Sequence, residues 1–167
     1  MKQGIKQTKF SRHQNGLTSV EVAVVGLVFF VILFGVIETG RVFYVLNSLD
    51  EVTRRGARVA AVCQVDDPAI SQIAIGNPSG DSSLSRLVPG LSVSDVQVSY
   101  LNEVGGIVTD PSASGDFVDI RYVQVSVPDF QHRFIIPTFF TTFTLPEFRT
   151  TLPRESLGVS RDGFTPC

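Results

Sequence analysis

Glu21 is the ionisable residue of this sequence whose surroundings most suggest a function. It stands at the start of a run from Val22 to Ile37 that contains no polar side chain, and thirteen residues of this run are Val, Leu, Ile or Phe. A carboxylate that is drawn into lipid costs roughly 3 kcal/mol, so acids inside membranes are generally paired. Glu21 therefore needs a basic partner.

Gly16 lies five residues before Glu21, directly after a basic leader. This arrangement is typical of a prepilin processing site, in which a peptidase cuts after the glycine on the cytoplasmic side. The cut would make Leu17 the new N-terminus. The freed α-amino group of an adjacent subunit could then pair with Glu21, so that neither charge is buried alone. The alternative is that Glu21 snorkels at the membrane interface and that the glycine spacing is chance.

The two cysteines, Cys63 and Cys167, are far apart, and neither belongs to a CxxC motif or a Cys/His cluster. Zinc binding and redox catalysis are therefore not indicated. In an oxidising compartment a disulfide between them would close a very long loop, which is worth roughly 3 to 5 kcal/mol on chain-entropy reasoning. Two free thiols are the alternative.

Two further patterns could do chemistry but lack what it requires. Asp110 to Gly115 matches the opening of a calcium loop, yet the twelfth position is Arg121, where a bidentate Glu is needed, so we expect a hairpin loop. His132 is the only histidine beyond the leader, and we expect it to be an exposed turn residue. No acid, base, nucleophile or metal set can be assembled. The sequence thus predicts no catalytic site, no metal, no cofactor and no enzymatic activity.

The net charge of −2 hides an asymmetry between the leader and the rest of the chain. The first 15 residues carry +4 with no acid among them, so the remainder sums to −6. The later basic residues are arginines scattered among a slight excess of acids, which argues against a nucleic-acid surface. The basic residues of the leader, residues 1–16, are Lys2, Lys6, Lys9 and Arg12.

Residues 17–37 form a segment that is long enough to cross a membrane. As a helix they span about 31 Å, which matches the hydrocarbon thickness, and their apolar side chains contribute roughly −4 to −8 kcal/mol to insertion. A secretory signal peptide is the alternative, but this apolar region is too long and continues as helical sequence without a small-residue cleavage site. The short, uniformly basic leader favours a cytoplasmic N-terminus, although Arg41 also follows the segment closely.

The membrane helix is expected to continue outside the membrane over residues 38–63. Apolar residues recur there at three-to-four spacing with charged residues between them, which indicates one apolar stripe. Pro68 should end this helix, because proline cannot donate a hydrogen bond within it. Residues 64–167 would form the remaining domain, with short helical turns at 69–75 and 83–87.

Two β signals at 93–101 and 118–127 predict a hairpin. A third strand near 143–152 would complete a small antiparallel sheet, and Pro146 and Pro153 would place that strand at an edge. The expected fold class is α+β: a long N-terminal transmembrane helix that extends into a small domain with about three strands packed on it. Three aromatic residues near this strand are expected to pack in the core, and a patch for subunit contact is the alternative. They are Phe139, Phe140 and Phe143.

Residues 16 to about 61 show four features in order: a small-residue and Glu start, an apolar helix ending at a Glu-x-Gly-Arg boundary, an aromatic pair and a Gly-Ala-Arg step. This segment resembles the TadE-like family, the minor pilins or pseudopilins of the tight adherence (Flp) pilus. The matching residues are Glu21; Glu38, Gly40 and Arg41; Phe43 and Tyr44; and Gly56, Ala57 and Arg58.

The resemblance implies a structural protein with a pilin-like fold that takes part in assembly of a Tad-type pilus, and so in surface attachment. Its expected partners are other pilin and pseudopilin subunits, the prepilin peptidase and the pilus assembly machinery. Its expected location is the bacterial inner membrane, crossed once, with a periplasmic C-terminal domain. The alternative is a membrane-anchored periplasmic binding or scaffolding domain unrelated to pili, in which the helix is only an anchor.

Overall fold

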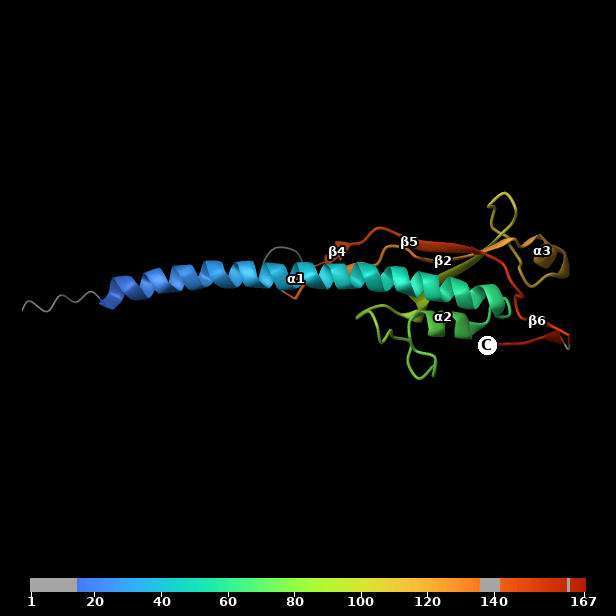
Figure 1. The fold of residues 1–167 in the computed structure, drawn as a ribbon, viewed down its shortest axis with the longest axis horizontal. Coiled ribbons are helices and arrows are strands. Elements are labelled where there is room, and N and C mark those ends of the chain that lie inside the picture. Colours follow the sequence, from blue (N-terminus) through green and yellow to red (C-terminus); the bar gives the residue numbers. More distant parts are fainter. Residues whose placement is uncertain (1–14, 136–141, 162) are drawn as a thin grey trace, which may run out of the picture. The chain divides into compact units, whose positions relative to one another are not determined.

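The computed structural model describes residues 15–135, 142–161 and 163–167, with side chains from residue 18 onward. The chain divides into two compact units, Met1–Thr39 and Gly40–Cys167, and each is described by itself. One helix, α1 (Asn15–Val62), contributes to both (Figure 1). Within the described part of the chain, it is the one helix that is long and apolar enough to cross a membrane.

In the second unit, α1 buries one face and exposes the other. Its exposed face carries acids and arginines one turn apart, and two ion pairs join Arg54 to Asp50 at 3.0 Å and Arg55 to Glu51 at 3.3 Å. Such exposed i,i+4 pairs add only about 0.3 to 0.5 kcal/mol each, so packing of the other face is what holds this part of the helix. The buried residues recur at three-to-four spacing: Val45, Leu49, Val52, Ala57, Ala60 and Ala61.

The main sheet is antiparallel and has the strand order β1-β2-β5, formed by β1 (Gln97–Leu101), β2 (Tyr122–Val127) and β5 (Phe148–Pro153). The residues that pair across the three strands on the core-facing side of the sheet are mostly apolar. Val125 of β2 pairs with Val98 and Thr150, and the next row joins Tyr100, Val123 and Leu152. The Thr150 hydroxyl lies 2.9 Å from the Thr53 hydroxyl of α1, which satisfies two hydroxyl groups between sheet and helix.

Gly56 allows α1 to approach both of its neighbours closely. A Cβ atom at this position would lie 3.0 Å from the Ala74 Cβ of α2 (Pro68–Ala74) and 3.0 Å from the Val125 Cγ1 of β2. In Figure 1 the sheet lies on one side of this part of α1 and α2 lies on the other. The glycine of the Gly-Ala-Arg step therefore has a packing role, which any side chain would disturb.

The chain leaves α1 through a short turn that also starts α2. Asp67 caps α2, since its side chain accepts a hydrogen bond from the Ala69 N–H at 2.8 Å, and Pro68 occupies the first turn, where no N–H is needed. Asp66 has a positive φ of 58°, which fits a short polar residue in a tight turn. Its N–H donates to the Tyr100 hydroxyl at 3.2 Å.

The C-terminal segment caps the end of α1. The last carbonyl groups of a helix lack partners within it, and here the N–H groups of Glu155 and Leu157 donate to Ala61 O at 3.0 and 3.2 Å. Gly158 N–H donates to Val62 O at 2.7 Å. Gly158 has a φ of 78° and leaves no room for a side chain, because a Cβ there would lie 2.7 Å from the Gln64 backbone.

The remaining elements are short. A 3-10 helix, η1 (Val93–Asp95), precedes β1, and α3 (Ser114–Asp119) lies between β1 and β2. Two further pairs of antiparallel strands complete the structure. After β2 in the sequence, β3 (Gln131–Arg133) pairs with β4 (Thr142–Thr144). After β5, β6 (Val159–Ser160) pairs with β7 (Gly163–Phe164).

The α+β fold class is confirmed: a long apolar helix is followed by a small domain with a three-stranded antiparallel sheet. The helical turn expected at 69–75 is α2, and the third strand is an edge strand, as its prolines predicted. Other boundaries were wrong. Residues 93–95 form η1 and residues 118–119 end α3. The sequence 143–152 is divided between β4 and β5, and residues 83–87 contain no helix.

Candidate functional site

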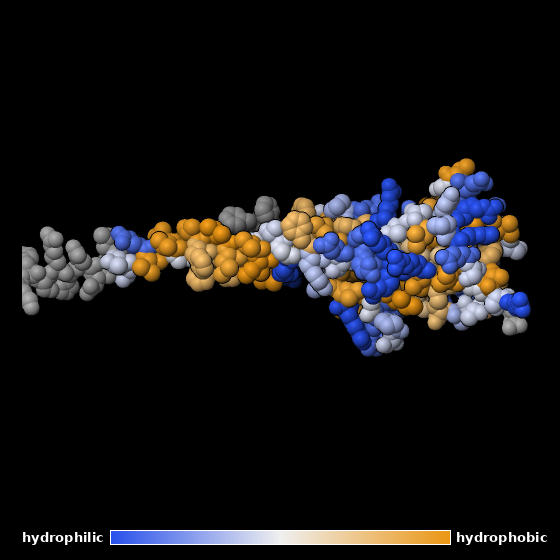
Figure 2. Space-filling model, viewed as in Figure 1, coloured by the Kyte–Doolittle hydropathy of each residue, from blue (hydrophilic) through white to orange (hydrophobic). Residues whose placement is uncertain are grey.

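The first unit presents an apolar helical surface on every side. All large apolar side chains of α1 from Val20 to Ile37 are exposed, from 38% at Leu33 to 69% at Val25. Figure 2 shows this part of α1 as hydrophobic surface. A helix that is apolar all round is stable only when lipid or other protein covers it. This surface is therefore one of contact, with a membrane or with neighbouring helices.

Glu21 is the carboxylate on this apolar surface. Its side chain is exposed, and no hydrogen bond or ion pair joins its carboxylate to another residue of the described chain. Together with Val22, Val25, Gly26 and Phe29 it lines a shallow depression. These positions follow the three-to-four spacing of one helix face, and Gly26 makes room where a side chain would otherwise stand. The result is a carboxylate at one end of an apolar groove.

Gly16 and Leu17, the proposed processing residues, lie in the first turn of α1, which begins at Asn15. Their side chains are outside the described part of the chain. The peptide bond between Gly16 and Leu17 lies on the same helix as Glu21.

Cys63 and Cys167 are joined in a disulfide, with their Cα atoms 5.5 Å apart. Cys63 is the first residue after α1, so the bridge fixes the end of the chain to the end of the helix. The Cys167 N–H also donates to the Asp67 carboxylate at 2.8 Å. Nearby, burial raises the pKa of the Tyr100 phenol to about 12. The disulfide, the Tyr100 contact and the cap by residues 155–158 all hold the same end of α1.

Asp110 and Arg121, the first and twelfth positions of the calcium-loop pattern, make hydrogen bonds to residues close to them in the chain. The Asp110 carboxylate accepts hydrogen bonds from the Ser112 hydroxyl at 2.7 Å and the Ser112 N–H at 3.3 Å, and these bonds hold the pKa of Asp110 below its usual range. The Arg121 guanidinium donates to the Val118 carbonyl at 2.9 Å. As expected, residues 110–115 lie in the connection between the antiparallel strands β1 and β2, and this connection also contains the short helix α3.

Two further predictions in the second unit were wrong. His132 is not an exposed turn residue: it lies in β3, is only 3% exposed, and its ring meets Phe134 edge-on with centroids 5.4 Å apart. Phe143 does not belong to the core, since it is 52% exposed on β4. Phe139 and Phe140, the other members of that aromatic group, lie outside the described residues.

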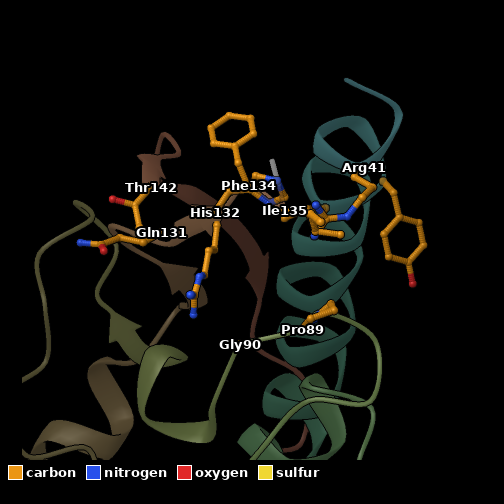
Figure 3. Close-up of a pocket in the computed structure, with 11 residues that line it drawn as sticks. Arg41, Pro89, Gly90, Gln131, His132, Phe134, Ile135 and Thr142 are labelled. Carbon is orange, nitrogen blue, oxygen red and sulfur yellow. The ribbon is translucent and has the colours of Figure 1, made fainter. Parts of the chain in front are cut away.

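A pocket of about 750 Å³ opens beside β3 in the second unit. Figure 3 shows its walls: Arg41 extends from α1, Pro89 and Gly90 come from the loop before η1, and further residues come from β3 and β4. The pocket is lined by arginine, histidine and tyrosine side chains together with apolar ones. The remaining lining residues are Tyr44, Val45, Gln131, His132, Arg133, Phe134, Ile135 and Thr142.

Sequence reasoning missed this pocket because it missed the β3–β4 hairpin. Strands of three residues are too short to show a clear period. Two signals were nevertheless present. Phe130 and Phe134 lie two positions to either side of His132, with polar residues between them. Arg41 follows the apolar run by only four residues, where arginine and aromatic side chains commonly mark a membrane boundary.

No cluster of three or more His, Cys, Asp or Glu side chains occurs in the part of the chain that the structure describes.

Comparison with known proteins gives one match. The family model described as TadE-like protein matches residues 16–58, about a quarter of the chain. Neither the curated proteins nor the solved structures contain a match. The matched segment begins at the glycine of the proposed processing site and ends at Arg58 of the Gly-Ala-Arg step, so it includes Glu21 and Gly56. Residues 16–58 therefore carry the sequence of the TadE-like family, which confirms the resemblance drawn from the same residues.

Proposed function

We propose that this protein is a minor pilin or pseudopilin that takes part in assembling a Tad/Flp-type pilus, and that α1 is its assembly surface. The observation that carries the proposal is Glu21, an exposed carboxylate without a described partner at the start of the apolar run of α1. The TadE-like match over residues 16–58 supports a pilus-associated role.

In this proposal a prepilin peptidase cuts between Gly16 and Leu17, which removes the basic leader. The new α-amino group of one subunit then pairs with Glu21 of a neighbour. Burying either charge alone would cost several kcal/mol, whereas the pair can be accommodated between packed helices. The charge pair thus selects the register in which the helices of two subunits pack. The apolar groove between Glu21 and Phe29 supplies the contact area.

The proposal places the protein in the bacterial inner membrane, crossed once by residues 17–37, with the N-terminus cytoplasmic and the domain periplasmic. Two features support this topology. The leader is uniformly basic, as cytoplasmic flanks are, and the Cys63–Cys167 disulfide suits an oxidising compartment. The proposed partners are other pilin and pseudopilin subunits, the prepilin peptidase and the assembly machinery. The role is structural and uses no cofactor.

Glu21→Gln tests the charge pair. The substitution keeps the size of the side chain and the cleavage residues, so processing should continue, while pilus assembly should fall at least tenfold because the neighbouring α-amino group loses its partner. Shed and surface pili are measured by immunoblot and electron microscopy. Glu51→Gln is the control, since Glu51 is an exposed acid on the domain part of the same helix. Normal pili in the Glu21→Gln strain would remove the charge-pairing role.

A helix exchange separates this function from that of a simple anchored domain. Residues 17–37 are replaced by an unrelated membrane helix of equal length. An assembly subunit loses its function in this chimaera even when the domain is folded and membrane-bound. A chimaera that functions normally would instead indicate a tethered periplasmic binding or scaffolding domain.

A further inference from the structure

The β3–β4 hairpin lies beside the start of the domain part of α1. The pocket described above is lined both by Arg41 and Tyr44 of α1 and by Arg133, Ile135 and Thr142 of the hairpin region. All of these residues belong to the second unit. Arg41 in turn follows Ile37, the last residue of the apolar run, by four positions in the same helix. The hairpin is therefore close to the residues at which α1 would leave a membrane.

The hairpin and the adjacent part of α1 expose large apolar side chains. Ile135 is 69% exposed, Tyr44 is 56% exposed and Phe143 is 52% exposed. The Tyr44 hydroxyl donates to the Leu87 carbonyl at 2.9 Å, which fixes its ring on the surface. Exposed apolar groups of this size cost free energy in water, and aromatic residues with one polar end are typical of the membrane–water interface.

Two arginines lie among these apolar groups. Arg41 and Arg133 both line the pocket, and Arg133 is exposed. A guanidinium group binds phosphate through two parallel hydrogen bonds, and its long stem lies easily on apolar surface. Arg41, Tyr44, Arg133 and Ile135 line one pocket, and Phe143 pairs with His132 across the hairpin. Arginine, tyrosine and aliphatic side chains around one pocket thus match the layer in which phospholipid phosphates meet the acyl chains.

We propose that the β3–β4 hairpin contacts the phospholipid headgroup layer on the domain's side of the membrane, with Ile135 and Phe143 entering the interface and Arg41 and Arg133 binding lipid phosphates. This inference rests on the proposed membrane crossing of α1. Its consequence is that the domain is held against the membrane by a second contact. A subunit that enters a fibre must first break this contact, so lipid would compete with assembly for the hairpin.

Tryptophan fluorescence tests the proposal, because the sequence contains no tryptophan and every introduced one is a single reporter. Three variants of the full chain are compared: Phe143→Trp on the hairpin, Phe164→Trp on β7 as the control, and Phe29→Trp in the apolar run. Phe164 is 58% exposed, slightly more than Phe143 at 52%. Each variant is reconstituted into two sets of phosphatidylglycerol and phosphatidylcholine vesicles, with bromine on the acyl chains near the headgroup in one set and near the bilayer centre in the other, because Phe29 lies in the middle of the apolar run.

We expect bromine to quench Phe29→Trp and Phe143→Trp and to leave Phe164→Trp unaffected. If Phe29→Trp is quenched while Phe143→Trp behaves like Phe164→Trp, the hairpin does not touch lipid and the inference fails alone. If Phe29→Trp also escapes quenching, the membrane crossing itself fails, and the proposed function fails with it.

The arginines are tested in the Phe143→Trp background. Arg133→Gln should lose part of the quenching in vesicles that contain anionic lipid, because one basic residue contributes about 1 kcal/mol to binding at such a surface. Arg149→Gln, which alters an exposed arginine of β5, should lose none. Equal quenching in both variants would overturn the phosphate-binding role of Arg133.

Discussion

The two parts of α1 differ in what surrounds them, although one continuous helix contains both. From Val20 to Ile37 the large apolar side chains are exposed. From Val45 to Ala61 the apolar residues of one face are buried under the sheet and α2, and charged residues cover the other face. Small residues occur in both parts, Gly26 and Gly35 in the exposed part and Gly56 in the buried one, but only Gly56 has atoms of other elements close to it.

This difference shows that apolar content alone does not predict which part of a helix is packed inside its own chain. The domain part has a polar face, so water can solvate one side while the core covers the other. The first part has no polar face and therefore depends on lipid or on other subunits. Substitutions should accordingly affect domain stability in one part and membrane or subunit contacts in the other.

Breaking the disulfide should have the largest effect, and it should be confined to the domain. The cysteines are separated by 104 residues, and closing a loop of that length stabilises the folded state by about 4 to 5 kcal/mol. We expect Cys63→Ala with Cys167→Ala to lower the unfolding temperature of the domain strongly, as followed by circular dichroism. Reductant should lower that of the native protein equally and leave the variant unchanged. A native protein insensitive to reductant would contradict this prediction.

A matched pair of leucine substitutions sharpens the comparison directly. Leu49 is 0% exposed in the domain part of α1, and Leu27 is 65% exposed in the first part. Leu49→Ala leaves a cavity in the core and should cost about 3 kcal/mol of domain stability in a urea unfolding experiment. Leu27→Ala should leave that stability unchanged. Equal losses in both variants would mean that the first part of α1 packs within its own chain.

The pH dependence of stability should show the smallest effect, at the end of the domain part of α1. The pKa of Tyr100 is about 12 in the folded protein and 10 when the phenol is solvated, so the unfolded state loses its proton first as pH rises. The contribution of the neutral phenol is fully present below pH 10 and is lost between pH 10 and 12. Tyr100→Phe should flatten this loss in melting curves. An unchanged alkaline loss in Tyr100→Phe would assign it to other groups.

The sequence predicts well what depends on long periodic patterns. The apolar run, its three-to-four continuation and the strand signals at 93–101 and 118–127 led to a helix followed by a three-stranded sheet, and the structure has both. Pro146 and Pro153 also located an edge strand, because proline lacks the N–H that an inner strand needs. Glu21 and Gly16 were found by type and spacing alone, and their roles stay predictions.

The features that the sequence did not predict depend on contacts between distant segments. His132 is buried because β3 packs against other parts of the domain, and the local pattern, Phe130 and Phe134 two positions to either side, is too short to show this by itself. The cap on α1 by residues 155–158 joins positions almost a hundred residues apart through backbone hydrogen bonds, which carry no side-chain signal. β6 and β7 have two residues each, too few for any periodicity.

The central claim is that α1 becomes an assembly surface that begins at Leu17. N-terminal sequencing of the protein purified from cells with an active prepilin peptidase tests it most directly. The account predicts that the mature chain starts at Leu17, and that replacing Gly16 leaves the basic leader in place. A mature protein that still begins at Met1 in those cells would contradict the claim.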